Sequence, residues 1–444
     1  AVLGGIVAAR GHLSEGAESP SGKMVSLAAH PAVPPGLSRA YPFFVVSTMV
    51  LFLFSDLGLG TVVNIVFRAG DDTTTIGPAF SFSVMTLSRD SIRGGAFLIA
   101  ILIVGLSGVW PFVKLGMLLF AWLAPPSRLG MQRRSRLLQF LDEYGKYSLV
   151  DSWLAILALC AFDIKWFSQE ASVNVTPVPK LPFFTFVVAS VLSLVLGHIA
   201  TEFNRRCLDD SMLTKSFSRS QMTNVDHRAL VQDLPLGQAI LLLGLTVFTG
   251  VSLVVGACVI SLQYQISGAI ADLLLREEEK ELSYSLVSLG LFLTKGFEES
   301  GGLHAVQLIF FLFALVIPLV LVIALLALLL MPMEQHSRVL LLKGCHILDA
   351  WAAFDVFVIA VVVANFEFWL LTEFLIYHDN IADACNWVQD NMNVECLAMQ
   401  CHIQSGFTIL ALAGVCSYAT PKLVFRLCQG VHSEAAESSD SEDQ

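Results

Sequence analysis

The sequence predicts an all-α polytopic membrane protein with eight transmembrane helices, arranged as two tandem four-helix repeats. The 444-residue chain is 55% hydrophobic and only 14% charged, and its mean hydropathy is +0.70. Its apolar residues gather in runs of the length that a helix needs to cross about 30 Å of hydrocarbon. The same order of segments also occurs twice along the chain, which predicts the two repeats.

Eight apolar runs are long enough to span a membrane. They are Phe43–Phe67, Gly95–Leu123, Tyr147–Phe167, Leu181–Thr201, Gly237–Gln263, Ala305–Met331, Ala350–Ile376 and Ile403–Leu427. They predict a first repeat at residues 41–203 and a second at 237–428, joined by a cytoplasmic linker at 204–236. Residues 1–40, rich in Gly, Ala, Ser and Pro, are predicted to be mobile, and the acidic tail at 429–444 to be disordered.

The loop charges predict the orientation of the chain. Basic residues concentrate between the second and third spans and between the fourth and fifth, at Arg128, Arg133, Arg134, Arg136, Lys146, Arg205, Arg206, Lys215, Arg219 and Arg228. Such loops stay in the cytoplasm. The segment Glu367–His402 is acidic and lacks Lys and Arg. Eight spans then place both termini in the cytoplasm, and charges divided by membrane side exclude a nucleic-acid partner.

The internal repeat pairs two prolines and two aspartates. Pro111 corresponds to Pro318, and each lies in an apolar run that it should kink, because proline frees a backbone carbonyl. After a basic loop, Asp151 corresponds to Asp355, each four residues after an aromatic residue. Since four spans separate equivalent points, the repeats should be related by an axis along the membrane normal.

Asp151 and Asp355 are the first candidate functional residues. An acid within a span costs several kcal/mol unless it is neutralised, paired or hydrated, so such residues are functional candidates. The alternative is structural, because a carboxylate about one turn from a helix N-terminus is stabilised by roughly 0.3 to 1 kcal/mol. Lys114 should lie at the depth of Asp151 and form a buried ion pair with it. Leu321 corresponds to Lys114, so Asp355 should lack such a partner.

Two further polar residues fall in apolar runs. Asp56 lies about thirteen residues into the first run, near the expected middle of the bilayer, and Gly58 beside it would allow close approach. Alternatively the helix ends at Gly58 and Asp56 lies at the outer surface. His198, near the end of the fourth run, could relay protons or simply satisfy a hydrogen bond.

The cysteine pattern and the motif search exclude several classes of site. The chain has nine cysteines but no CxxC pair, which argues against a zinc site. Cys385, Cys396 and Cys401 cluster in the acidic loop, where an oxidising compartment could pair two of them; reduced thiols are the alternative. No Walker loop, GxSxG or HExxH motif is present, so we predict no enzyme, metal or cofactor.

The repeated strings resemble the paraquat-inducible protein A (PqiA) family. They are "YSLVSLGLFL", "GVWPFVKL" with "LVIPLVLV", and "GKYSLVDSWLAILAL" with "WAAFDVFVIAVVVA", and the resemblance covers about residues 41–428. It implies a lipid-handling transporter that works with periplasm-spanning MCE proteins. Many bacterial members carry a four-cysteine zinc ribbon before each half. Here the first is absent and the second region retains only Cys207, so the resemblance does not extend to the ribbons.

The leading functional hypothesis is a transporter or translocation component that loads a lipid between its two repeats. The polar head would lie near Lys114, Asp151 and Asp56, and Pro111 and Pro318 would act as hinges. Its partners would be membrane lipids and an MCE-type or other lipid-transfer protein on the non-cytoplasmic side. The alternatives are a tetraspanin-like scaffold that recruits partners, or a proton-coupled carrier of a small solute.

Overall fold

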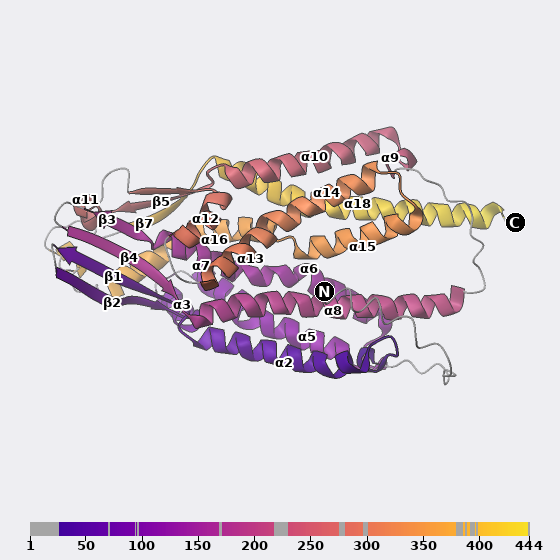
Figure 1. Cartoon of the computed structure of the whole chain (residues 1–444), viewed down its shortest axis with the longest axis horizontal. Coiled ribbons are helices and arrows are strands. Elements are labelled where there is room, and N and C mark those ends of the chain that lie inside the picture. The colour runs from indigo at the N-terminus through magenta and orange to yellow at the C-terminus, as the bar shows by residue number, and fades with distance from the viewer. Residues whose placement is uncertain are drawn as a thin grey trace.

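The computed structural model describes residues 26–69, 72–93, 95, 97–167, 171–216, 230–274, 280–295, 301–378, 385–386, 389–390, 396 and 398–442. Its long helices form an elongated bundle, with two small antiparallel sheets at one end (Figure 1). Seven described helical stretches are long and apolar enough to cross a membrane. The protein is therefore a multi-pass membrane protein, as the sequence predicts.

The first half of the chain alternates long helices with short strands. After a short 3-10 helix η2 (Leu27–Ala29), its elements are α2 (Pro35–Leu57), β1 (Thr61–Ala69), β2 (Asp72–Phe82), α3 (Val84–Arg93), α4 (Phe97–Leu102), the π-helix η3 (Ile103–Val109), α5 (Trp110–Leu123), α6 (Met131–Tyr144), the 3-10 helix η4 (Gly145–Leu149), α7 (Val150–Ala161), β3 (Ile164–Phe167), β4 (Ala171–Pro179) and α8 (Leu181–Ser216). Strand order in its sheet is β2-β1-β4-β3.

The second half follows a similar order. Its elements are α9 (Leu230–Asp233), α10 (Leu236–Cys258), β5 (Leu262–Ser267), α11 (Ala269–Leu274), β6 (Glu281–Tyr284), α12 (Leu286–Lys295), α13 (Gly301–Phe311), the π-helix η6 (Leu312–Val316), α14 (Ile317–Leu330), α15 (Gln335–Trp351), α16 (Phe354–His378), β7 (Ala398–Ile403) and α18 (Gly406–Glu442). Strand order in its sheet is β6-β5-β7, and all neighbouring strands in both sheets are antiparallel.

The strands were not predicted, and they shorten several predicted spans. The first predicted helix runs to Phe67, whereas α2 ends at Leu57 and β1 begins at Thr61. The fifth predicted span runs to Gln263, whereas α10 ends at Cys258 and strand β5 begins at Leu262. Apolar stretches rich in Val, Ile and Thr are compatible with either element, and these β-branched residues pack well in sheets. The predicted spans therefore merged a helix with the strand that follows it.

The third predicted span, Tyr147–Phe167, is wrong as a single helix. Helix α7 has twelve residues and ends at Ala161, and Ile164 already begins strand β3. Twelve residues of α-helix extend only about 18 Å, which is less than the roughly 30 Å of a hydrocarbon core. Helix α6 and the 3-10 helix η4 precede α7, so the region forms an interrupted helical element.

The terminal segments also differ from the prediction. Residues 26–40 contain η2 and the start of α2, and Leu27 is fully buried, so this part of the predicted mobile segment is packed. Helix α18 continues to Glu442, so residues 429–442 are helical rather than disordered. Extending an existing helix costs far less than nucleating one. Residues 1–25 and 443–444 lie outside the described residues.

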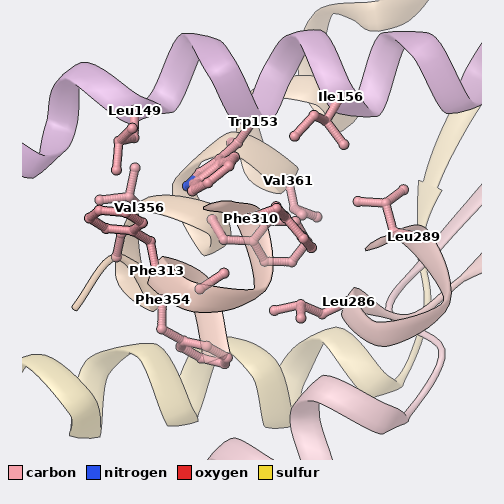
Figure 2. Close-up of a cluster of buried hydrophobic side chains, with 14 of the residues drawn as sticks. Leu149, Trp153, Ile156, Leu286, Leu289, Phe310, Phe313, Phe354, Val356 and Val361 are labelled. Atoms are coloured by element: carbon pink, nitrogen blue, oxygen red, sulfur yellow. The ribbon is translucent and has the colours of Figure 1, made fainter. Parts of the chain in front are cut away.

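The larger hydrophobic core joins the two halves of the chain (Figure 2). Phe310 of α13 lies edge-on to Trp153 of α7, with ring centroids 5.0 Å apart, and 5.6 Å from Phe357 of α16. Helix α7 packs against α12 of the other half, and α16 packs against α3. Each half therefore places its aspartate-bearing helix against the short helix of the other half.

Each π-helix ends next to a proline. Pro111 lies in the first turn of α5 directly after η3, and Pro318 in the first turn of α14 directly after η6. Proline has no N–H to donate to a carbonyl in the preceding turn. The π-helix also shifts the backbone hydrogen bonds by one residue, so some carbonyls of η3 and η6 need donors from outside the helix. The carbonyl of Phe313 in η6 accepts the backbone N–H of Ala353 at 3.0 Å. The hinge role of the prolines stays a prediction.

Candidate functional site

Two interrupted helices meet in the interior of the bundle. Helices α6 and α15 lie on the side of the interruptions away from the sheets, and α7 and α16 lie on the side toward the sheets (Figure 1). The first interruption is η4, and the second is the pair Ala352 and Ala353 between α15 and α16. A helix that stops inside an apolar region leaves backbone carbonyls without helical donors, and these must be satisfied by other groups.

A buried lysine supplies the missing donor at each interruption. Lys114 of α5 is fully buried and donates from Nζ to the carbonyl of Gly145 at 3.3 Å and to the hydroxyl of Ser193 at 3.0 Å. Lys146 of η4 donates from Nζ to the carbonyl of Ala352 at 2.9 Å. Cations are stabilised at the carbonyl ends of helices, so both lysines stabilise the non-helical backbone at the interruptions.

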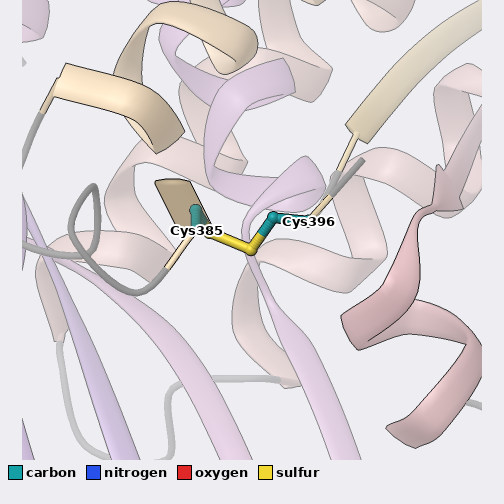
Figure 3. The surroundings of a disulfide bond; sticks show 2 residues. All are labelled: Cys385 and Cys396. Carbon is teal, nitrogen blue, oxygen red and sulfur yellow. A yellow bond between two sulfur atoms is a disulfide. The ribbon is translucent and has the colours of Figure 1, made fainter. Parts of the chain in front are cut away.

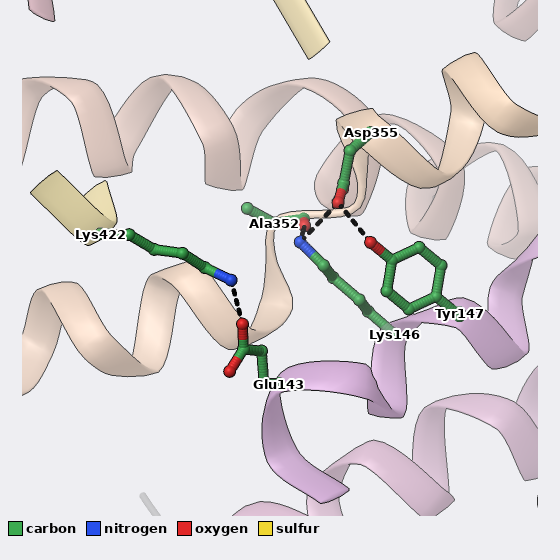
Figure 4. A network of polar contacts seen from close by, with 6 residues as sticks. All are labelled: Glu143, Lys146, Tyr147, Ala352, Asp355 and Lys422. Atoms are coloured by element: carbon green, nitrogen blue, oxygen red, sulfur yellow. Dashed lines mark hydrogen bonds and ion pairs between the residues drawn. The ribbon is translucent and has the colours of Figure 1, made fainter. Parts of the chain in front are cut away.

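Lys146 also forms an ion pair across the two halves (Figure 4). Its Nζ lies 2.9 Å from Oδ2 of Asp355, and the hydroxyl of Tyr147 donates to the same oxygen at 3.2 Å. The prediction that Asp355 lacks a cationic partner is therefore wrong. The internal repeat gives no sign of this pair, because the cation comes from η4 of the opposite half.

A second cross-half pair lies in the same region of the bundle (Figure 4). Lys422 of α18 pairs with Glu143 of α6, and the ammonium also lies 3.6 Å from the centre of the Tyr418 ring. The side chains of Lys422 and Glu143 are 27% and 41% exposed, against 5% and 12% for Lys146 and Asp355. The Lys146 pair is thus much the more buried of the two.

The predicted ion pair between Lys114 and Asp151 is not formed. The ammonium of Lys114 binds Gly145 and Ser193 instead, and the acid whose charge acts on it is Asp142 of α6. Asp151 lies in the first turn of α7, where it lines a cavity. Similar depth along two helices did not bring the side chains together, because η4 places the backbone of Gly145 beside Lys114.

Asp56 lies in the last turn of α2, one residue before Leu57 ends the helix. The helix therefore ends next to Gly58, as the alternative predicts. The depth of Asp56 in the bilayer stays a prediction. Asp56 is nevertheless buried, at 9% exposure, and its Oδ1 has no hydrogen-bond partner among the described residues. The charges of Asp56 and Asp151 interact electrostatically, so these two acids belong to one region of the protein.

His198 of α8 lies near Asp142 of α6 and does not line the cavity. Its Nδ1 is 3.7 Å from Oδ1 of Asp142, the acid that also acts on Lys114. Its ring meets Trp351 of α15 edge-on, with centroids 6.3 Å apart. His198 therefore contacts both halves, and its proton-relay role stays a prediction.

A cavity of about 140 Å³ lies beside Asp151. Its walls are mostly apolar and come from α2, β1, α3, η3, α7 and α8 of the first half, and Val363 and Ala364 of α16 line it from the second half. Its polar lining residues are Ser55, Thr61, Ser83, Asp151 and Ser152. The sequence predicted a cavity between the halves, but most of this one lies within the first half, and Lys114 does not line it.

The position that the predicted repeat pairs with the cavity carries a phenylalanine in the second half. Ile103 lines the cavity eight residues before Pro111, and Phe310 stands eight residues before Pro318. Phe310 is fully buried, and its ring lies edge-on to that of Trp153 (Figure 2). It also lies edge-on to the ring of Phe357. A phenyl ring thus takes the place of the smaller isoleucine side chain. The two halves therefore differ at this position.

The end of the molecule that carries the sheets contains one disulfide. Cys385 and Cys396 are joined, in the acidic segment where the sequence placed three candidate cysteines (Figure 3). Cys401 of β7 is a buried free thiol, and burial raises the pKa of its thiol to about 12. At neutral pH this thiol is therefore protonated and unreactive, because the thiolate is the nucleophile.

Comparison with known proteins identifies one part of the chain. The matching stretch runs from the start of α13 through η6, α14 and α15 into α16. It therefore contains Pro318, the second interruption and Asp355. No curated protein and no solved structure matches the chain. The chain is a multi-pass membrane protein whose residues 300–375 match the family model of paraquat-inducible protein A.

Proposed function

We propose that the protein transports an amphiphile, such as a membrane lipid, and holds part of its apolar chain in the cavity beside Asp151. The observation that carries the proposal is a mostly apolar cavity among helices that can cross a membrane, with few polar groups in its lining. Ligand sites commonly combine apolar walls with a small number of placed polar groups. The match to paraquat-inducible protein A also agrees with a transport-related role.

The size of the cavity sets what it holds at one time. At about 140 Å³, it is close to an engineered apolar cavity of about 150 Å³ that binds benzene. It therefore accommodates a segment of one acyl chain, and a whole lipid requires the helices to separate. Helix α16, which lines the cavity from the second half, and the π-helices next to Pro111 and Pro318 are the elements that would move.

We propose that the two halves are tandem repeats related by an axis along the membrane normal. The order of helices, strands and π-helices supports this. A close contact supports it independently: a Cβ on Gly58 would meet Pro182, and a Cβ on Gly406 would meet Val259. Both contacts join the end of the first long helix of a half to the start of its last helix. The glycine follows the first helix in the first half and begins the last helix in the second half.

The same relation gives the proposed topology. Helices α6 and α7 with η4 would form one crossing, as α15 and α16 do, which makes eight crossings and places both termini in the cytoplasm. The sheets would then lie on the non-cytoplasmic side, where an MCE-type or other lipid-transfer partner would receive the lipid. The proposed process moves a lipid without covalent chemistry, so no enzymatic step is needed.

Filling the cavity tests the proposal. Ala155→Phe should abolish lipid retention, because it places a ring between α7 and its neighbours. Val188 of α8 is 48% exposed, so Val188→Phe should leave retention unchanged. Native mass spectrometry of gently extracted protein would count bound lipids, and unfolding curves would show that both variants are folded. Equal lipid retention by folded Ala155→Phe would refute a role for this cavity and favour a scaffold.

A further inference from the structure

The cavity contains unsatisfied hydrogen-bonding capacity. Ser152, which follows Asp151 on α7, is 1% exposed, and its hydroxyl has no hydrogen-bond partner among the described residues. By contrast, Ser55 donates to the carbonyl of Phe52, and Ser83 shares hydrogen bonds with Thr86 in the first turn of α3. An unsatisfied buried hydroxyl is unfavourable, so Ser152, next to Asp151, points to a ligand with a polar group.

The cavity offers no cation to such a ligand. None of the residues that line it is Lys or Arg. The two buried lysines nearby are already engaged: Lys114 binds Gly145 and Ser193, and Lys146 binds Ala352 and Asp355. An anion that entered would lose its hydration without gaining a counter-ion, which is strongly unfavourable in an apolar site. This argument holds whether Asp151 is ionised or protonated.

We propose that the cavity receives an amphiphile end that carries an uncharged or cationic hydrogen-bond donor, a hydroxyl or an amine, and rejects an anionic end. The carboxyl oxygens of Asp151 accept from the donor, and the hydroxyl of Ser152 donates to the oxygen of a ligand hydroxyl or accepts from the N–H of a ligand ammonium. The inference rests on the proposed function, because it assigns the chemistry of the same site. The phosphate of a phospholipid would remain outside the cavity.

Three probes of equal chain length separate the possibilities: octan-1-ol, octylamine and octanoate. Binding to the full chain in lipid nanodiscs would be measured by native mass spectrometry and by thermal shift. Folded Ala155→Phe serves as the reference, because it retains partitioning into the lipid but fills the cavity. Octanol and octylamine should bind the wild type above this reference. Octanoate should bind at least about tenfold more weakly, equivalent to ~1.4 kcal/mol.

Each outcome decides a different statement. Equal binding of the three probes above the reference would overturn the selectivity and leave the chain site intact. Binding of all three at the level of Ala155→Phe would overturn both the inference and the proposed function.

Asp151→Asn should reduce octylamine binding more than octanol binding, because only the amine gains from a full negative charge. Ser152→Ala, which is isosteric apart from the hydroxyl, should weaken octanol binding; unchanged affinity in both variants would contradict the assigned contacts.

Discussion

Lys146→Met should destabilise the protein by about 3 to 5 kcal/mol, because it leaves Asp355 buried without its cation. The side chains of Lys146 and Asp355 are 5% and 12% exposed, and they come from opposite halves of the chain. The substitution also removes the donor to the carbonyl of Ala352 at the second interruption. The hydroxyl of Tyr147 remains as a neutral donor to Asp355, but it cannot offset the charge.

A double-mutant cycle tests whether this loss reflects the pair itself. Asp355→Asn alone leaves the ammonium of Lys146 buried, whereas the double variant removes both charges and should recover most of the lost stability. The free energy of unfolding would be measured by denaturant titration in micelles. Lys422→Met is the matched control: its pair with Glu143 also joins the halves but is more exposed, and it should cost about 1 kcal/mol or less. Strictly additive losses for Lys146 and Asp355 would contradict the coupling.

Gly406→Ala is expected to be the second severe substitution, with a cost of about 1 to 3 kcal/mol from overpacking. A Cβ at Gly406 would meet the carbonyl oxygen of Ile260 and the side chain of Val259. The oxygen belongs to backbone that leads directly into strand β5, so it cannot rotate away as a flexible side chain could. The expected result is separation of the start of α18 from the end of α10.

A second glycine provides the control for this substitution. Gly244 lies inside α10, and a Cβ there meets nothing within 4 Å. Gly244→Ala should therefore stabilise the helix by roughly 0.5 to 1 kcal/mol, because alanine loses less conformational entropy than glycine. The midpoint of thermal unfolding would be compared for the two variants. Similar midpoints for both variants would show that the contact at Gly406 is not tight.

The membrane class and most helices could be predicted from the sequence because they depend on local composition. Twenty apolar residues in a row are sufficient to indicate a membrane helix wherever they fold. The strands could not be separated from the spans in this way. β1 and β5 begin within a few residues of the helices before them. Val62 and Val63 of β1, and Ile260 just before β5, continue the apolar run. Whether such a stretch forms a strand depends on partners such as β4 and β7, which are distant in sequence.

The sequence drew attention to several buried charges of this region but did not indicate their contacts. Asp151, Asp355 and Lys114 all lie in the region of the interrupted helices, as the buried charges suggested. Their partners depend on η4, which brings the carbonyl of Gly145 to Lys114 and sends Lys146 to the other half. The 3-10 helix has no strong sequence signal, and a cross-half contact leaves no periodic pattern. Lys146 was therefore interpreted only as a loop charge that sets orientation.

The central claim, that an apolar chain occupies the cavity beside Asp151, can be tested directly by photo-crosslinking. A phospholipid with a diazirine at the end of one acyl chain would be incorporated into nanodiscs with the full-length protein. After irradiation, the modified residues would be mapped by peptide mass spectrometry. We expect labelling of cavity residues such as Ala155, Phe186 and Val363, and its loss in folded Ala155→Phe. Labelling confined to exposed positions such as Phe43 and Val188, unchanged in that variant, would contradict the account.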